Sequence, residues 1–249
     1  MFDLVDTTLL VLRRGSRVAA LATLLLVGAT VAPGIALALT GIPPLLVALA
    51  FFAFFFLVVP VALAAPFAAY AKALDEEPRL LETLRAALAL APRLLPATLC
   101  SIVPAVFIPT GVLYAFRVLS HEKIPGAEGL AAPFLPLMIP VGLGVWVRYV
   151  AVPAAAIALE RSSWREANAR AHSLCRRRPF LLGFATGAPL VFLLALIPTG
   201  PSQEAIHAVF SVQGVAVVRF ALGFAALMGA LLLTGALGVA GYRVASHEE

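Results

Sequence analysis

A segment rich in arginine separates two apolar runs in the second half of the chain. Residues 161–178 contain six arginines and one acidic residue, Glu166, whereas residues 149–159 and 179–199 contain no charged side chain. Long apolar runs are typical of membrane spans, and arginines gather in the loops on the cytoplasmic side of a membrane. The pattern therefore predicts that residues 161–178 lie in the cytoplasm between two spans.

The rest of the chain repeats this alternation of apolar runs and short polar segments. Of its 249 residues, 62% are hydrophobic and 12% are charged, and the mean hydropathy is +1.01. Soluble domains carry about 25% charged residues, so the composition indicates an all-α, polytopic membrane protein. Because a helix needs about 20 residues to cross a bilayer, we expect six transmembrane helices in a single membrane domain over residues 1–249. They fall at residues 18–40, 45–70, 96–116, 130–159, 180–197 and 220–242.

Three segments combine charged residues with an apolar face, and they predict amphipathic helices at the membrane surface. They are residues 2–14, residues 78–95 after the second span, and residues 163–177 after the fourth. In the last of these, Ser163 and Glu166 fit the S-x-x-E capping box that begins a helix. Five residues recur there at helical spacing and form one apolar face: Trp164, Ala167, Ala171, Leu174 and Cys175. This segment is either a lipid-sensing or docking element or a connector that only follows the positive-inside rule.

The distribution of basic residues predicts the orientation of the chain. Of the 18 Lys and Arg residues, 14 fall in segments assigned to one side, and only Arg117 and Lys123 fall on the other. This asymmetry predicts an inner (plasma) membrane protein with both termini in the cytoplasm. A cleaved signal peptide would be an alternative for the N-terminus, but the apolar run 18–40 is longer than the 7–15 residues typical of such a peptide. We therefore interpret that run as the first span.

The residues E-R-S-S-W-R-E-A-N-A-R-A-H-S-L, from 160 to 174, resemble the signature of a family of six-span bacterial membrane proteins of unassigned function. That family includes the membrane domain fused to some glycerophosphoryl diester phosphodiesterases. The positions that match its pattern are Glu160, Ala167, Arg170 and Leu174, and those that depart from it are Asn168, Ala171 and Arg177. The resemblance implies the six-span layout but no activity, because the phosphodiesterase chemistry belongs to a separate soluble domain.

The predicted spans lack the residues that intramembrane chemistry uses. None contains Asp, Glu, Lys or His in its interior, whereas ion-coupled transporters and intramembrane enzymes usually keep an ionisable group there. The four histidines lie in predicted loops without metal-binding spacing, and neither Cys100 nor Cys175 has a neighbouring metal ligand. We therefore expect no catalytic residue, no metal site and no cofactor.

Arginines are the remaining candidates for a functional site. Arg148 lies between Trp146 and Tyr149 near the end of the fourth predicted span, where it either reaches the membrane surface or contacts an anion or lipid phosphate. Arg219 marks the outer boundary of the last span. The candidate lipid or anion contacts are Arg148, Arg161, Arg165, Arg170, Arg176, Arg177 and Arg178.

Two further patterns leave alternatives open. Small residues favour close helix contacts, so certain glycines of the last two spans should pack either within the bundle or between protomers. They are Gly183, Gly187, Gly235, Gly238 and Gly241. A unit of span, amphipathic helix and span also occurs twice, at residues 45–116 and 130–197, which fits either a duplication or a coincidence.

Three classes of function follow, in decreasing order of support. The first is a non-enzymatic scaffold or accessory protein whose basic helices contact anionic membrane lipids, a protein partner or a second copy of the chain. The second is a small transporter or lipid-handling permease in which Arg148 contacts an anionic group. An enzyme is third, and nucleic acid is not an expected partner because no basic stretch belongs to a soluble domain.

Overall fold

The computed structural model describes residues 2–38, 44–102, 144–196 and 212–247, and within these ranges the secondary structure is entirely helical. Eight elements follow one another along the chain. They are α1 (Phe2–Ala38), α2 (Pro44–Ala73), α3 (Leu80–Ile102), the π-helical turn η2 (Val147–Ala151), α7 (Val152–Glu160), α8 (Trp164–Arg177), α9 (Pro179–Leu196) and α11 (Val212–His247). The expected all-α class is thus confirmed.

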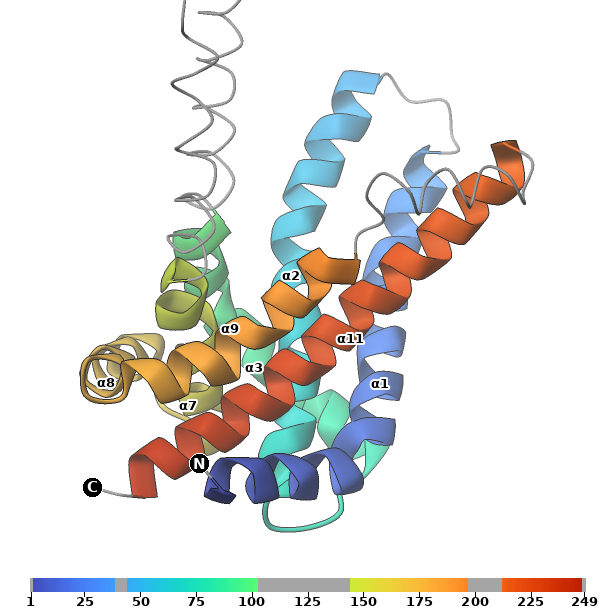
Figure 1. Cartoon of the computed structure of the whole chain (residues 1–249). Helices are drawn as coiled ribbons and strands as arrows, with labels where there is room; N and C mark the ends of the chain where they lie inside the picture. The colour runs from blue at the N-terminus through green and yellow to red at the C-terminus, as the bar shows by residue number, and fades with distance from the viewer. Residues whose placement is uncertain (1, 39–43, 103–143, 197–211, 248–249) are drawn as a thin grey trace, which may run out of the picture.

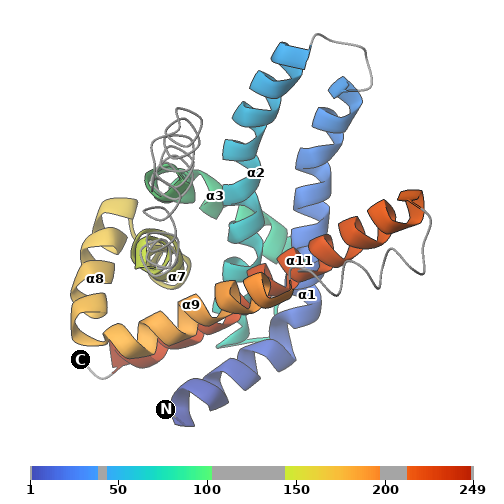
Figure 2. The same cartoon turned by 45° about the horizontal axis from the view of Figure 1, so that its top comes forward.

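Neighbouring helices pair along the chain, and α11 joins the pairs. Helices α1 and α2 pack against each other, α2 packs against α3, and α9 packs against α11, which also contacts α1 and α2 (Figure 1). The first turns of α1 run across the lower end of the structure before the helix rises beside α2, and α8 lies at the left side, where Figure 1 shows it end-on beside α7 (Figures 1 and 2). Both termini and the α2–α3 turn lie at this lower end.

Small residues allow α11 to pack closely on α2. A Cβ atom added to Gly235 would lie 2.7 Å from Cβ of Pro66, and one added to Gly238 would lie 3.0 Å from Cε1 of Phe67. These distances leave no room for a side chain, so both glycines serve packing within the bundle. Gly183, by contrast, has nothing within 4 Å of such an atom, and Gly187 is buried in α9.

The prediction of six transmembrane helices is wrong for the part of the chain that the structure describes. There, one segment is long and apolar enough to cross a membrane, namely Met228–Ser246 in α11. It fits an association of the protein with a membrane. The predicted spans at 18–40, 45–70 and 180–197 coincide with parts of α1, α2 and α9, but none of these helices meets the same criterion over its described residues.

The predicted third and fourth spans differ from the structure in where helices begin and end. Residues 96–102 continue α3, whose earlier turns carry Glu82, Arg85 and Arg93. Residues 144–146 are helical and lead into the five-residue π-helical turn η2 and the nine-residue α7. Residues 103–143, which include Arg117, Lys123, most of the third predicted span and the first part of the fourth, lie outside the described ranges.

The three predicted surface helices have different outcomes. The segment 163–177 is confirmed as a separate helix, α8. The segments 2–14 and 78–95 are helical but are not separate elements, because each continues into the longer helices α1 and α3. Arg219 lies within α11, and its side chain is not among those that the structure describes.

Candidate functional site

Helix α8 begins with the capping box that its sequence predicts. The backbone N–H of Ser163 donates to Oε2 of Glu166 at 3.0 Å, and the backbone N–H of Glu166 donates to Oγ of Ser163 at 3.4 Å. The first of these bonds, made to the ionised carboxylate, lowers the pKa of Glu166. The reciprocal pair fixes the start of α8 three residues after the end of α7.

The apolar face of α8 packs on the bundle. Ala167, Ala171 and Leu174 are buried, and Trp164 and Cys175 pack beside them while remaining partly exposed. Burial raises the pKa of the Cys175 thiol above its ordinary value. The predicted apolar face is therefore confirmed, and its partner is protein: α8 contacts η2, α7, α9 and α3.

One carboxylate connects three helices at the end of α7. Oε1 of Glu160 accepts a hydrogen bond of 2.7 Å from the hydroxyl of Tyr242 in α11. Oε2 of the same residue pairs with the guanidinium of Arg170 in α8, and this pairing raises the pKa of Arg170. Tyr242 is 1% exposed and the Glu160 side chain is 28% exposed. The cluster of Glu160, Arg170 and Tyr242 is therefore partly buried where the three helices meet.

The four residues that carry the family resemblance lie in this cluster or on the helix face beside it. Glu160 and Arg170 form the ion pair, and Ala167 and Leu174 belong to the buried face of α8. The short motif thus contributes residues that fix α8 to the bundle. Tyr242, which completes the cluster, lies 82 residues from Glu160. The sequence signal that could have indicated this contact is a polar hydroxyl at the end of the last apolar run.

The turn between α7 and α8 has an unusual backbone. Arg161 ends α7 in the left-handed region (φ 55°, ψ 23°), and it is the one non-glycine residue with a positive φ in the described ranges. This conformation costs roughly 1–2 kcal/mol for a residue with a Cβ. Nη1 of Arg93 in α3 donates to the carbonyl oxygen of Arg161 at 2.9 Å and holds the turn.

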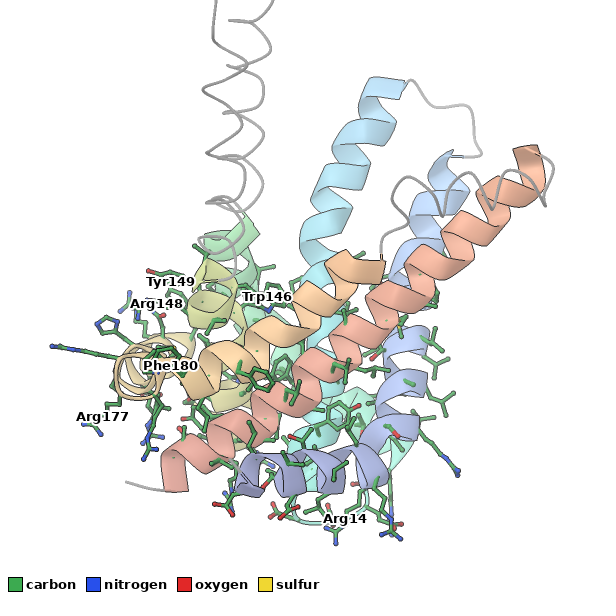
Figure 3. All side chains as sticks on the ribbon, viewed as in Figure 1. Arg14, Trp146, Arg148, Tyr149, Arg177 and Phe180 are labelled. Atoms are coloured by element: carbon green, nitrogen blue, oxygen red, sulfur yellow. The ribbon has the colours of Figure 1, made fainter. Side chains whose placement is uncertain are left out.

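The remaining predicted arginines divide into an exposed group and one half-buried residue. Arg165 and Arg176 are exposed on α8, and so are Arg177 and Arg178 at its end. Figure 3 shows Arg177 pointing away from the helices. These arginines adjoin Phe180, which is 91% exposed in the first turn of α9.

Arg148 lies apart from this exposed group, in η2. It is half-buried, and its guanidinium carbon is 5.1 Å from the centre of the Tyr149 ring, a distance typical of a cation–π contact. Its positive charge also lowers the pKa of the Cys175 thiol, against the larger effect of burial. Arg148 belongs to η2, which contacts α8, and it lies beside that helix in Figure 3.

Two hollows flank the turn at Arg161. One, of about 980 Å³, lies over α8 and is lined by Glu160, Glu166, Arg170 and Ser173 together with Arg161. The other, of about 680 Å³, lies between the α2–α3 turn, α3, the end of α7 and the end of α11. In the described residues no group of three or more His, Cys, Asp or Glu side chains is placed to hold a metal ion.

Comparisons with protein-family models, with curated proteins and with solved structures gave no match. The resemblance carried by residues 160–174 therefore stays a prediction.

Proposed function

We propose that the protein is a non-enzymatic, multi-pass protein of the inner membrane that acts as a scaffold or accessory and uses the outer surface of α8 to contact anionic lipid headgroups. We define this α8 surface by Arg165, Arg176 and Phe180. The observation that carries the proposal is that the apolar face of α8 is closed against the bundle, while its arginines are exposed. The helix therefore offers a cationic surface and does not insert its own apolar face into lipid.

The chemistry of the α8 surface suits a membrane interface. Each arginine near an anionic leaflet contributes roughly 1 kcal/mol of attraction. Phe180 adds an exposed aromatic ring beside Arg177 and Arg178, and aromatic side chains are frequent at the headgroup level. The same arrangement recurs at the N-terminus, where the exposed side chains of Val5 and Leu9 precede Arg13 and Arg14.

The position of these groups supports an orientation with both termini in the cytoplasm. The N-terminal turns of α1, the α2–α3 turn and the C-terminus lie at one end of the structure (Figure 1). Exposed leucines (Leu21, Leu24 and Leu25) lie farther along α1, as expected for a surface in contact with lipid tails. Basic residues at one end and apolar residues beyond them follow the positive-inside rule.

The test compares wild type with the double variant Arg165→Gln/Arg176→Gln after reconstitution into nanodiscs of phosphatidylcholine and phosphatidylglycerol. We expect the ratio of anionic to neutral lipid that remains bound to fall at least twofold in the variant, and 0.5 M NaCl should lower the wild-type ratio in the same way. The matched control is Arg17→Gln/Arg79→Gln, which removes two exposed charges elsewhere. Equal lipid ratios in wild type and the α8 variant would overturn the proposal.

A second candidate function is that of a permease, and the placement of Arg148 favours it. This half-buried arginine has no carboxylate within 4.0 Å among the described residues. A buried cation of this kind suits an anionic cargo. Native mass spectrometry of Arg148→Ala beside wild type distinguishes the two functions, because only a cargo site at Arg148 predicts loss of a bound anion in that variant.

A further inference from the structure

A groove on the side of α3 facing α7 is lined by five cationic residues from four parts of the chain. Lys72 comes from the end of α2, Arg85 and Arg93 from α3, Arg161 from the α7–α8 turn, and Arg243 from the end of α11. We call this hollow, of about 680 Å³, the basic groove. Its size lies within the ~300–1,000 Å³ range of small-molecule sites.

The positive charge of the basic groove is only partly compensated within the described residues. Lys72 pairs with Glu82 at 2.8 Å, and Arg93 is bonded to a backbone carbonyl. In contrast, Arg85, Arg161 and Arg243 have no carboxylate within 4.0 Å in the described ranges. The acidic residues in the lining are Asp75 and Glu76, both exposed in the α2–α3 turn.

The floor of the basic groove is apolar and closed. Ala68, Leu90 and Ile157 line it, and each is buried, with exposed fractions of 5%, 7% and 1%. An apolar floor lowers the local dielectric constant, so an anion held there interacts more strongly with arginine than it would on an open surface. It also offers contact to carbon atoms next to the anionic group.

The left-handed backbone conformation of Arg161 is a second, independent observation in favour of a functional role for this residue. Glycine is the usual residue at a left-handed helix end, because it has no Cβ to clash. Position 161 is instead an arginine, and this residue lines the basic groove. Unfavourable backbone conformations of this kind gather at functional sites.

We infer that the basic groove binds a phosphate group carried by a partly apolar molecule, with Arg85, Arg161 and Arg243 as its ligands. The planar guanidinium group matches the geometry of phosphate oxygens and forms paired hydrogen bonds with them. Two sources of this chemistry fit the groove, a phospholipid headgroup and a soluble phosphate ester. The inference does not depend on the α8 surface, which lies on another part of the molecule.

The test measures binding to the full chain by isothermal titration calorimetry. The protein is held in phosphatidylcholine nanodiscs, and the probes are phosphatidic acid added in mixed micelles, hexyl phosphate and inorganic phosphate. We expect saturable binding of at least one phosphate ester, and at least tenfold weaker binding by Arg85→Gln/Arg243→Gln. The double variant Arg17→Gln/Arg79→Gln, which loses the same charge outside both the basic groove and the α8 surface, should bind as wild type does.

A glycine at position 161 separates binding from folding. Arg161→Gly removes the side chain and relieves the backbone, and it keeps the carbonyl that accepts from Arg93. We expect this variant to melt at or above the wild-type temperature and to bind the phosphate ester at least threefold more weakly. Its failure to fold would remove only this variant from the test, since the Arg85/Arg243 pair probes the same groove.

Each outcome decides between the sources or overturns the inference. Binding of phosphatidic acid alone identifies a membrane lipid, and binding of hexyl phosphate as well identifies a soluble ester. Absence of saturable binding by every probe overturns the inference. So does an equal loss of affinity in the groove variant and in Arg17→Gln/Arg79→Gln, because that result shows a general charge effect. Loss of lipid retention in the α8 variant alone would bear on the proposed function and would not affect the inference about the basic groove.

Discussion

The hydroxyl of Tyr242 donates a hydrogen bond of 2.7 Å to Oε1 of Glu160, across 82 residues of sequence. The other oxygen of Glu160 pairs with Arg170 in α8. The end of α7, the middle of α8 and the last turns of α11 are therefore joined through one carboxylate, and the position of α8 on the bundle depends on it. This dependence can be measured, because the two partners of Glu160 can be removed one at a time.

Removing the Tyr242 hydroxyl should destabilise the bundle. Tyr242→Phe deletes a hydrogen bond to a charged group, and such bonds are worth about 1.5–3 kcal/mol. We expect a lower melting temperature in detergent micelles, followed by circular dichroism at 222 nm. The matched control is Tyr70→Phe, because the buried Tyr70 hydroxyl has no hydrogen-bond partner in the described residues. Its removal should be neutral or stabilising, and a larger loss there than at Tyr242 would contradict this account.

A methyl group at position 235 should force α11 away from α2. In Gly235→Ala the new Cβ would lie 2.7 Å from Cβ of Pro66 and 3.2 Å from its backbone carbonyl carbon, and overpacking of this kind costs about 1–3 kcal/mol. Gly229→Ala in the same helix meets nothing within 4 Å, and replacing a mid-helix glycine by alanine stabilises by roughly 0.5–1 kcal/mol. Thermal unfolding should therefore move in opposite directions for the two variants. Parallel shifts would show that α11 packs differently.

Local signals in the sequence were enough to predict α8. Its capping box and its apolar face depend on residues at most 11 positions apart, so both could be recognised without knowledge of the rest of the fold. The hydrogen bond from Tyr242 to Glu160 joins residues 82 positions apart. No helical periodicity or motif spacing reports a contact of that range, and this part of the site required the structure.

The sequence did not correctly predict where the helices begin and end. A surface helix was expected at residues 78–95 and a separate span from residue 96, but α3 continues without a break through Pro92 and Pro96 to Ile102. In the expected span 130–159, the described part contains a π-helical turn before α7, which its sequence did not predict. Hydropathy reports where apolar residues gather, but tertiary packing decides whether a helix continues, so the number of spans could not be derived from it.

The stability of the protein should fall in acid through two carboxylates outside the core. The hydrogen bond from Lys72 lowers the pKa of Glu82, and the backbone N–H of Ser163 lowers that of Glu166. Each folded pKa lies below the unfolded value of about 4.3. Their contribution is therefore present above that pH and is lost as the pH falls through the folded pKa.

A pH series tests this linkage directly. Between pH 7 and pH 3 we expect the melting temperature of wild type to fall, mainly below about pH 4.3. In Glu82→Gln/Glu166→Gln the fall should be smaller, because neither position can titrate. Ser163→Ala should lower the melting temperature at pH 7, since loss of an N-cap costs about 0.5–2 kcal/mol, whereas Ser173→Ala in the middle of α8 should not. An unchanged acid dependence in the double variant would assign it to other groups.

The reactivity of Cys175 should report the position of Arg148. Burial raises the pKa of this thiol, and the nearby charge of Arg148 partly opposes that effect. Because the thiolate is the reactive form, Arg148→Gln should raise the pKa further and slow alkylation at pH 8. The measured quantity is the ratio of the alkylation rates of the variant and wild type at pH 8.

Alkylation by iodoacetamide in a Cys100→Ser background isolates this thiol. Arg148→Lys keeps the charge and should restore most of the rate, and Arg165→Gln, on the exposed side of α8, should leave it unchanged. An equal rate in Arg148→Gln and wild type would mean that Arg148 does not lie beside the inner face of α8. The permease hypothesis would then rest only on the half-burial of Arg148 and on the lack of a carboxylate within 4.0 Å in the described residues.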